Sequence, residues 1–466
     1  MDFSLLVFWE VLLVLCAVLF VGNAICHLMG RNPCVFQKTA LLATSLVMLG
    51  MTSVTSLIVF LAVSLYCYAV CAVSGNRGVR CRRILLIINI PVLFLPLVYY
   101  KYAGFVCEVV TGNQYDVFRD VIIPVGISFY SFQIVGFMID TLAKGEKVPS
   151  LGNYMLFCAY FPQIVAGPIE RRRDLLPQMQ DLNLIWRREN LQSGASLIVL
   201  GLFYKMVMAD NLAQAFWQDY HGNNACIVWL NNLIFGLRIY FDFAGYGITA
   251  YGIARCMGVK LRMNFKSPYT ATNITEFWRR WHTSLTLWFR DYIYIPLKGN
   301  RTRLWWLNVL VVFTISGIWH GAGWNFIIWG LLSGVAMVVH RLFSKSGFRL
   351  PAIIGWGMTM WVMSFIWMFF YATDTSQFVY YLGLLTSWEN YDFAINTMLM
   401  PEQGMRCMAK PFVLLSAAVI SAEYMSNRLY GDPYILFCKP LVVGVMVYLL
   451  VLLHHGGHNP FIYFSF

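Results

Sequence analysis

Long apolar runs separated by short polar loops extend along the whole chain. Most runs contain about 20 residues, the length that an α-helix needs to cross the hydrocarbon core of a bilayer. Strands of a membrane β-barrel would alternate apolar and polar residues, and these runs do not. The pattern therefore predicts an all-α polytopic membrane protein. Its first span is predicted at 4–28, because that run lacks the basic start of a signal peptide. Further full spans are predicted at 84–106, 121–139, 194–216, 226–256, 352–371, 412–425 and 441–453.

Three apolar runs do not have the length of one crossing. As a single helix, 39–73 would be about 52 Å long, whereas the hydrocarbon core is about 30 Å thick. We expect two passes there, broken near 50–53, and a similar break at two glycines within 304–340. The run at 151–166 is short and is expected to be re-entrant. Because half-crossing backbone needs protein or a watery cavity around it, we expect a ring of roughly 10–12 transmembrane and re-entrant helices around a central tunnel.

The charged residues are few and lie mainly in loops. Hydrophobic residues make up 59% of the chain and charged residues 12%, and the formal net charge is +12. The positive-inside rule places basic loops in the cytoplasm, so the N-terminus is expected outside. Because the basic residues follow the membrane topology, we expect no nucleic-acid partner. The basic loops lie at 31–38, 77–83, 171–188 and 341–349, and the longest external loop is expected at 374–410.

The stretch EFWRRWHTSLTLWFRDYIYIPLKGNR at 276–301 concentrates arginines and aromatic residues. Asn273 and Glu276 have the spacing of a capping box, which predicts the start of a helix. A continuous helix would carry one aromatic face with a single imidazole, and Glu276 would pair with Arg280. Such a helix is either an interfacial anchor or the lining of a cavity. The residues of the aromatic face are Trp278, Trp281, His282, Leu285 and Phe289.

A second histidine, His320, lies deep in an apolar run, in ISGIWHGAGWNF. A histidine inside a membrane is costly and indicates a functional site, although a hydrogen-bonded core histidine is the alternative. Neighbouring glycines permit a helix break or a close helix contact, and Trp319 and Trp324 are candidate pocket walls.

Other polar residues carry weaker signals. Asp242 lies in an apolar run, where it is expected to pair with Arg238, one turn earlier, or to carry a proton. The C-terminal histidines at 454, 455 and 458 have no carboxylate or cysteine nearby, so we expect no metal site.

The words WRRWH at 278–282, DYIYIPL at 291–297 and GIWHG at 317–321 together resemble the membrane-bound O-acyltransferase superfamily. The chain is most similar to its alginate and peptidoglycan O-acetyltransferase branch. The resemblance covers roughly 84–340, which we expect to be the catalytic core of a single domain, 1–466, with C-terminal helices at 350–466. The C-terminal PFIYFSF also resembles the ending of this branch.

This resemblance implies an enzyme of a bacterial inner membrane. A cytoplasmic acyl donor, acetyl-CoA, would enter one mouth of the tunnel, and an extracytoplasmic polysaccharide would be O-acetylated at the other, with an esterase-like partner transferase. Membrane lipid is the further expected partner, and no bound cofactor is expected. D-alanyl transfer to teichoic acid and a lipid or proton-coupled transporter are the alternatives.

The resemblance also implies site residues. His320 is the expected catalytic base, and His282 the second catalytic residue. Separately from the resemblance, their position next to the histidines in the sequence leads us to expect that indole N–H groups stabilise a developing oxyanion and that the arginines hold the phosphates of coenzyme A. The expected substrate-binding residues are Trp278, Arg279, Arg280, Trp281, Arg290, Asp291 and Trp319.

Overall fold

All regular structure in the described part of the chain is helical, as predicted. The computed structural model describes residues 2–75, 77–112, 118, 121–184, 186–393, 409–454 and 459–462. Within these ranges, eight helices are long and apolar enough to cross a membrane, and two shorter apolar helices accompany them. The prediction of an all-α polytopic membrane protein is therefore confirmed, and the tunnel stays a prediction.

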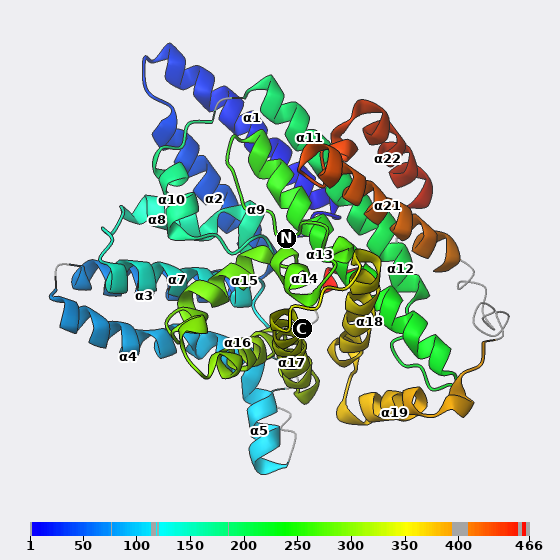
Figure 1. Ribbon diagram of the computed structural model, residues 1–466. Coiled ribbons are helices and arrows are strands. Elements are labelled where there is room, and N and C mark those ends of the chain that lie inside the picture. Colours follow the sequence, from blue (N-terminus) through cyan, green and yellow to red (C-terminus); the bar gives the residue numbers. More distant parts are fainter. Residues whose placement is uncertain are drawn as a thin grey trace. The chain divides into compact units, whose positions relative to one another are not determined.

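The chain divides into two compact units. The first unit comprises 1–198 and 249–262, and the second comprises 199–248 and 263–466. In the first unit, α3 lies beside α4 (Figure 1). The helices of the first unit are α1 (Leu6–Leu28), α2 (Cys34–Thr52), α3 (Val54–Ser74), α4 (Val79–Leu97), α5 (Ala103–Thr111), α7 (Ile127–Lys144), α8 (Leu151–Ala159), α9 (Phe161–Ile164), α10 (Arg172–Gln180) and the greater part of α11 (Arg188–Leu202).

The break predicted near 50–53 is confirmed. α2 ends at Thr52 and α3 begins at Val54, and the Ser53 side chain between them accepts a hydrogen bond from the N–H of Ser56 at 3.3 Å. A serine at this position satisfies one of the free N–H groups of a helix start, so it favours a new helix over a continuous one. The run at 151–166 forms two short, largely buried helices, α8 and α9, and its re-entrant course stays a prediction.

Two sequence predictions in the helical pattern are wrong. The span expected at 121–139 begins only at Ile127, because Gly126 is in the left-handed conformation and a Cβ there would meet the backbone of Ile164. The external loop expected at 374–410 contains a helix, α19 (Thr375–Thr386). Asp374 starts that helix by accepting a hydrogen bond from the N–H of Gln377 at 2.8 Å. Residues 394–408 of the predicted loop lie outside the described part.

The second unit contains the two histidine segments. Its helices are α12 (Asp210–Ala215), most of α13 (Ala225–Cys256), α14 (Ile274–Arg280), α15 (Thr283–Phe289), α16 (Trp305–His320), α17 (Trp324–Lys345), α18 (Ala352–Tyr371), α19, α21 (Ala409–Tyr430) and α22 (Pro440–Leu453). The run at 304–340 is broken between α16 and α17, as predicted.

These two helices pack closely side by side (Figure 1). Gly317 of α16 and Gly330 of α17 face each other, and a Cβ on either residue would meet the backbone of the opposite helix. Small residues at a helix contact let two backbones approach, which is how membrane helices gain packing energy. The contact fixes the end of α16, where His320 lies.

Candidate active site

His282 lies in a break between two short helices, not on the continuous helix that the sequence predicts. α14 ends at Arg280 and α15 begins at Thr283. Between them, Trp281 is extended, with φ −92° and ψ 128°, and His282 is left-handed, with φ 41° and ψ 56°. The prediction of one helical face over 273–289 is therefore wrong. No glycine or proline marks the break in the sequence.

Tertiary contacts hold this break in place. A non-glycine residue in the left-handed region costs about 1–3 kcal/mol and persists only where its surroundings impose it. The N–H of Thr283 donates to the carbonyl oxygen of Asn264 at 2.9 Å, and its hydroxyl donates to the carbonyl oxygen of Met263. The segment 263–264 thus fixes the backbone next to His282. Because of the break, the side chains of α14 and α15 do not share one face as they would on a continuous helix.

The start of α14 agrees with the prediction. The side-chain oxygen of Asn273 accepts a hydrogen bond from the N–H of Glu276 at 2.9 Å. Glu276 pairs with Arg280 at 2.5 Å and accepts the N–H of Thr272 at 2.9 Å. Burial alone would raise the pKa of Glu276, but the Thr272 N–H and the Arg280 charge outweigh it and lower that pKa. Arg280 therefore pairs with Glu276 within α14 and stabilises the start of that helix.

His282 and His320 line the same small cavity. His320 is the last residue of α16, so the break at Gly321 brings it to a helix end. The cavity has a volume of about 70 Å³. The imidazoles are almost completely buried, with 2% and 4% of their surfaces exposed. The cavity is lined by Trp278, Trp281, His282, Leu285, Thr286, Phe289, Val312, Phe313, Ser316 and His320.

Aromatic rings surround both imidazoles. Trp319 contacts both, with ring centroids 5.8 Å from His282 and 4.8 Å from His320. Trp329 lies edge-on to His320 at 4.8 Å, and Phe243 lies edge-on to His282 at 4.7 Å. Burial lowers the pKa of His282 to about 3, so this imidazole is neutral at physiological pH. A pKa so far below the working pH makes this imidazole a weak base, so His282 is suited to hydrogen bonding in its neutral form and not to holding a proton.

The predicted tryptophans differ in position and exposure. Trp278 and Trp281 line the cavity. The indole N–H of Trp278 is buried and has no hydrogen-bond partner among the described residues. Trp324, a predicted pocket wall, is instead 50% exposed.

The charged residues predicted to bind the donor do not line the cavity. Arg279 is exposed on α14. The side chain of Arg290 is 52% exposed and pairs with Asp291 at 2.7 Å. The structure therefore separates the predicted site into a small imidazole cavity and a set of charges outside it, and a role of these charges toward coenzyme A stays a prediction.

The buried ion pair of Asp242 differs from the predicted one. Asp242 pairs with Lys205 at 2.7 Å, not with Arg238, whose guanidinium lies over the ring of Phe216. Lys205 also pairs with Asp210 at 2.8 Å. A lysine 37 positions away in the chain, as the numbering gives, leaves no periodic signal in the sequence.

The C-terminal segment 459–462 is anchored on this ion pair. Lys205 donates to the carbonyl oxygen of Asn459 at 2.9 Å, and Asp242 accepts the N–H of Ile462 at 2.7 Å. The Phe461 ring, 1% exposed, lies 5.7 Å from the ring of Phe243, which in turn contacts His282. The segment therefore forms part of the support behind the His282 imidazole.

The described residues hold no group of three or more His, Cys, Asp or Glu side chains that is suited to a metal ion. Of the C-terminal histidine trio, the residues at 455 and 458 lie outside the described part.

Comparison with known proteins agrees with the geometry. The model of the membrane-bound O-acyltransferase family matches residues 138–384, a span that includes both histidines and the whole cavity. The chain belongs to this family. It is an acyltransferase, and the predicted enzyme class is confirmed.

Relatives of this acyltransferase act on cell-envelope polymers. A peptidoglycan O-acetyltransferase of Helicobacter pylori is 33% identical over 76% of this chain and 74% of its own length. A probable alginate O-acetylase of Pseudomonas aeruginosa is 31% identical over 85% of this chain and 78% of its own length. A teichoic acid D-alanyltransferase of Bacillus subtilis is 32% identical over 47% of this chain and 59% of its own length.

Proposed function

We propose that this acyltransferase moves an acetyl group from cytoplasmic acetyl-CoA across the membrane for the O-acetylation of an extracytoplasmic, alginate-like or peptidoglycan-like polysaccharide. The observation that carries the proposal is the convergence of the buried residues His282 and His320 on one small cavity. The O-acetylating relatives support the class of acceptor. The protein would lie in the inner membrane of a bacterium, with its N-terminus outside, and a partner esterase-like transferase would complete the transfer.

In the proposed reaction, the His320 imidazole removes the proton of the attacking hydroxyl. The hydroxyl oxygen bonds to the thioester carbonyl carbon, and the carbonyl oxygen becomes an oxyanion. Trp278 lines the same cavity and its indole N–H has no hydrogen-bond partner among the described residues, which supports it as the proposed donor to this oxyanion. The intermediate then collapses, the carbon–sulfur bond breaks, and the coenzyme A sulfur takes the proton from His320. The products are the acetyl ester and free coenzyme A.

The size of the cavity supports a short acyl group. Its volume is about 70 Å³. A cavity of about 150 Å³ accommodates benzene, and one water molecule occupies about 30 Å³. A space of this size is sufficient for a short acyl group such as acetyl.

The alternatives gain less support. The D-alanyl relative aligns with 47% of this chain, whereas the alginate relative aligns with 85%. The proposed O-acetylation therefore accounts for the helices after the cavity, where α18 contributes Phe370 against His320. Since the chain is an acyltransferase, a transporter is no longer needed to explain the buried histidines.

Replacing His320 tests the proposal. Protein with His320→Ala, reconstituted in vesicles, should insert normally and lose about 10²–10⁴-fold in acetyl transfer from radiolabelled acetyl-CoA, the range for removing a general base. The matched control is His27→Ala, which removes an exposed histidine at the end of α1. Transfer by His320→Ala at a rate similar to that of His27→Ala would refute the assignment of the base.

A further inference from the structure

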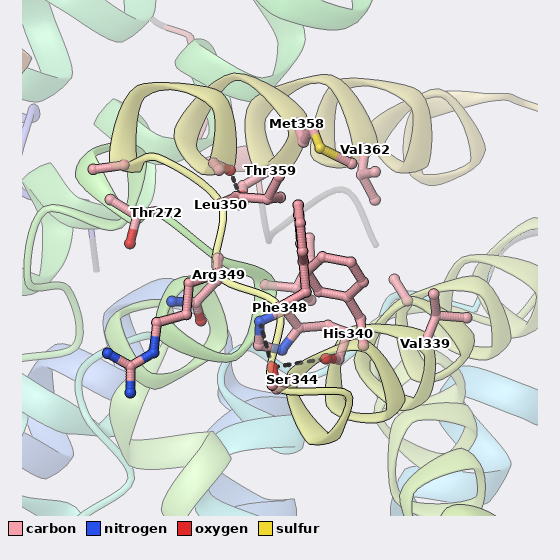
Figure 2. A pocket seen from close by; sticks show the side chains of 17 residues that line it. Thr272, Val339, His340, Ser344, Phe348, Arg349, Leu350, Met358, Thr359 and Val362 are labelled. Carbon is pink, nitrogen blue, oxygen red and sulfur yellow. Dashed lines mark hydrogen bonds between the residues drawn. The ribbon is translucent and has the colours of Figure 1, made fainter.

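A larger pocket lies between α17, α18 and the loop that joins them, away from the residues of the imidazole cavity. Its volume is about 690 Å³, within the range of about 300–1,000 Å³ that is typical of ligand sites. Figure 2 shows Val339, His340 and Ser344 on α17 opposite Met358 and Val362 on α18. None of these residues has a role in the proposed transfer reaction.

The lining changes from polar to apolar along the two helices. Polar side chains gather at the loop end, where Arg349, Ser344, His340 and Thr272 lie. The apolar end reaches Ala336 on α17 and Val362 on α18. At 1.5 Å per residue, each of these positions lies about 14–15 Å from the loop end of its helix. That depth equals half of a hydrocarbon core about 30 Å thick, which is one leaflet.

Apolar side chains of the pocket are open to the surroundings. Val339 is 58% exposed, Met358 54% and Phe343 40%. In water, such a cluster would be unfavourable, but these residues belong to helices long and apolar enough to cross a membrane. Acyl chains are therefore the surroundings that this end of the pocket fits.

The charges around the polar end favour an anion. Residues 292–373 contain six Lys and Arg residues and no Asp or Glu. Arg341 and Lys345 already lie over the ring of Trp305, at 4.3 and 4.9 Å. Arg349 is exposed and makes no hydrogen bond or ion pair with the described residues (Figure 2). The pocket lining contains no Asp or Glu, and Glu276, two residues after the lining segment 272–274, is paired with Arg280.

Two hydrogen bonds hold the polar end together. The His340 ring nitrogen Nδ1 lies 2.9 Å from the hydroxyl oxygen of Thr275, at the start of α14. The Ser344 hydroxyl donates to the carbonyl oxygen of His340 at 2.9 Å. The Thr275 contact joins α17 to the start of α14, directly after the lining segment Thr272–Ile274, whereas the Ser344 bond lies within α17. The polar end is therefore formed by three segments and not by two helices alone.

We propose that this pocket binds one anionic phospholipid. Its phosphate lies at Arg349, and one acyl chain runs between Val339 and Met358 toward Ala336. The lipid comes from the leaflet on the side of the α17–α18 loop, which the positive-inside rule predicts to be cytoplasmic. Phospholipids supply both features that the pocket requires, an anionic head group and an apolar chain of one leaflet's length. The binding is independent of the acetyl-transfer reaction.

Native mass spectrometry of the purified, delipidated full-length protein tests the site. Phosphatidylglycerol and phosphatidylcholine with identical acyl chains are titrated separately. Wild-type protein should bind one phosphatidylglycerol about fivefold more tightly than phosphatidylcholine, the factor expected for one arginine at an anionic head group. Arg349→Gln should abolish this preference, and Arg349→Lys should retain it. The matched control is Arg303→Gln, an exposed arginine in the same basic region that does not line the pocket.

A second variant tests the chain-binding end. Ala336→Trp fills that end and should weaken the binding of both lipids equally, because the head-group contacts remain. Glycerol phosphate, which has the anion but no chain, should bind far more weakly than phosphatidylglycerol. Three results would each overturn the proposal: equal binding of the two lipids by wild-type protein, an unchanged preference in Arg349→Gln, or glycerol phosphate binding as tightly as the lipid.

Discussion

Replacing Gly317 by alanine tests whether the contact between α16 and α17 holds His320 in place. A Cβ built on Gly317 overlaps the carbonyl oxygen of Phe326 and lies 3.1 Å from the Cα of Gly330. Carbon atoms at optimal contact are about 3.5–4.0 Å apart. Because both obstacles are backbone atoms, no side-chain rotation can relieve them. The helix α17 itself must shift.

The expected loss of stability follows from two opposing effects. An extra methyl group in a packed contact costs about 1–3 kcal/mol, and the rigid backbone here favours the upper end of that range. In the opposite direction, replacing glycine by alanine stabilises a helix by about 0.5–1 kcal/mol, because glycine is unfavourable inside a helix. The net decrease in the free energy of unfolding is therefore about 2 kcal/mol. Acetyl transfer should also fall, because a shift of α17 moves Trp329 against the His320 ring.

Unfolding by SDS in mixed detergent micelles measures this loss, with acetyl transfer measured on the same preparations. Gly357→Ala is the matched control, since Gly357 lies inside α18 and a Cβ there has no atom within 4 Å. The control should be as stable as wild-type protein or slightly more stable. Equal unfolding free energies for Gly317→Ala and Gly357→Ala would refute the inferred contact between the helices.

Three further predictions concern the support of the imidazoles. His282→Gly and His282→Ala remove the same ring, but the glycine variant should be about 1 kcal/mol more stable in SDS unfolding, because His282 has φ 41°; equal stability would contradict backbone strain. Because burial lowers the pKa of His282 to about 3, against 6.5 for a free histidine, the unfolded protein binds a proton that the folded protein does not as pH falls below 6.5. Wild-type protein should therefore lose about 2 kcal/mol more than His282→Gln between pH 6.5 and 5, and parallel pH profiles would exclude this linkage. Lys205→Met leaves the carboxylate of Asp242 without its cation and should cost about 3–5 kcal/mol in unfolding free energy, whereas Lys266→Met, at an exposed lysine, should cost little.

The predictions that succeeded depend on signals local to the chain. The length of the apolar runs identified the membrane class and the breaks at 50–53 and 321–323, because a bilayer has a fixed thickness. The capping box of Asn273 and Glu276 located the start of α14, because a cap acts within one helical turn. The words around His282 and His320 identified the family.

The predictions that failed depend on contacts between distant segments. Helical periodicity places Trp281 and His282 on one continuous helix, and only the hydrogen bonds of Thr283 to 263–264 impose the break. Likewise, Asp242 was paired with its neighbour one turn away, whereas the fold brings Lys205 to it.

By itself, the sequence determined a polytopic helical membrane protein with two candidate catalytic histidines. It could do so because the length of apolar runs and helix capping are properties of short segments. The tertiary structure decided that His282 and His320 share one small cavity, that the nearby arginines do not line it, and that the C-terminal segment packs behind Phe243, which contacts His282. These outcomes depend on side chains that lie far apart along the chain and meet only when the helices pack. No periodic pattern along the sequence encodes such a meeting.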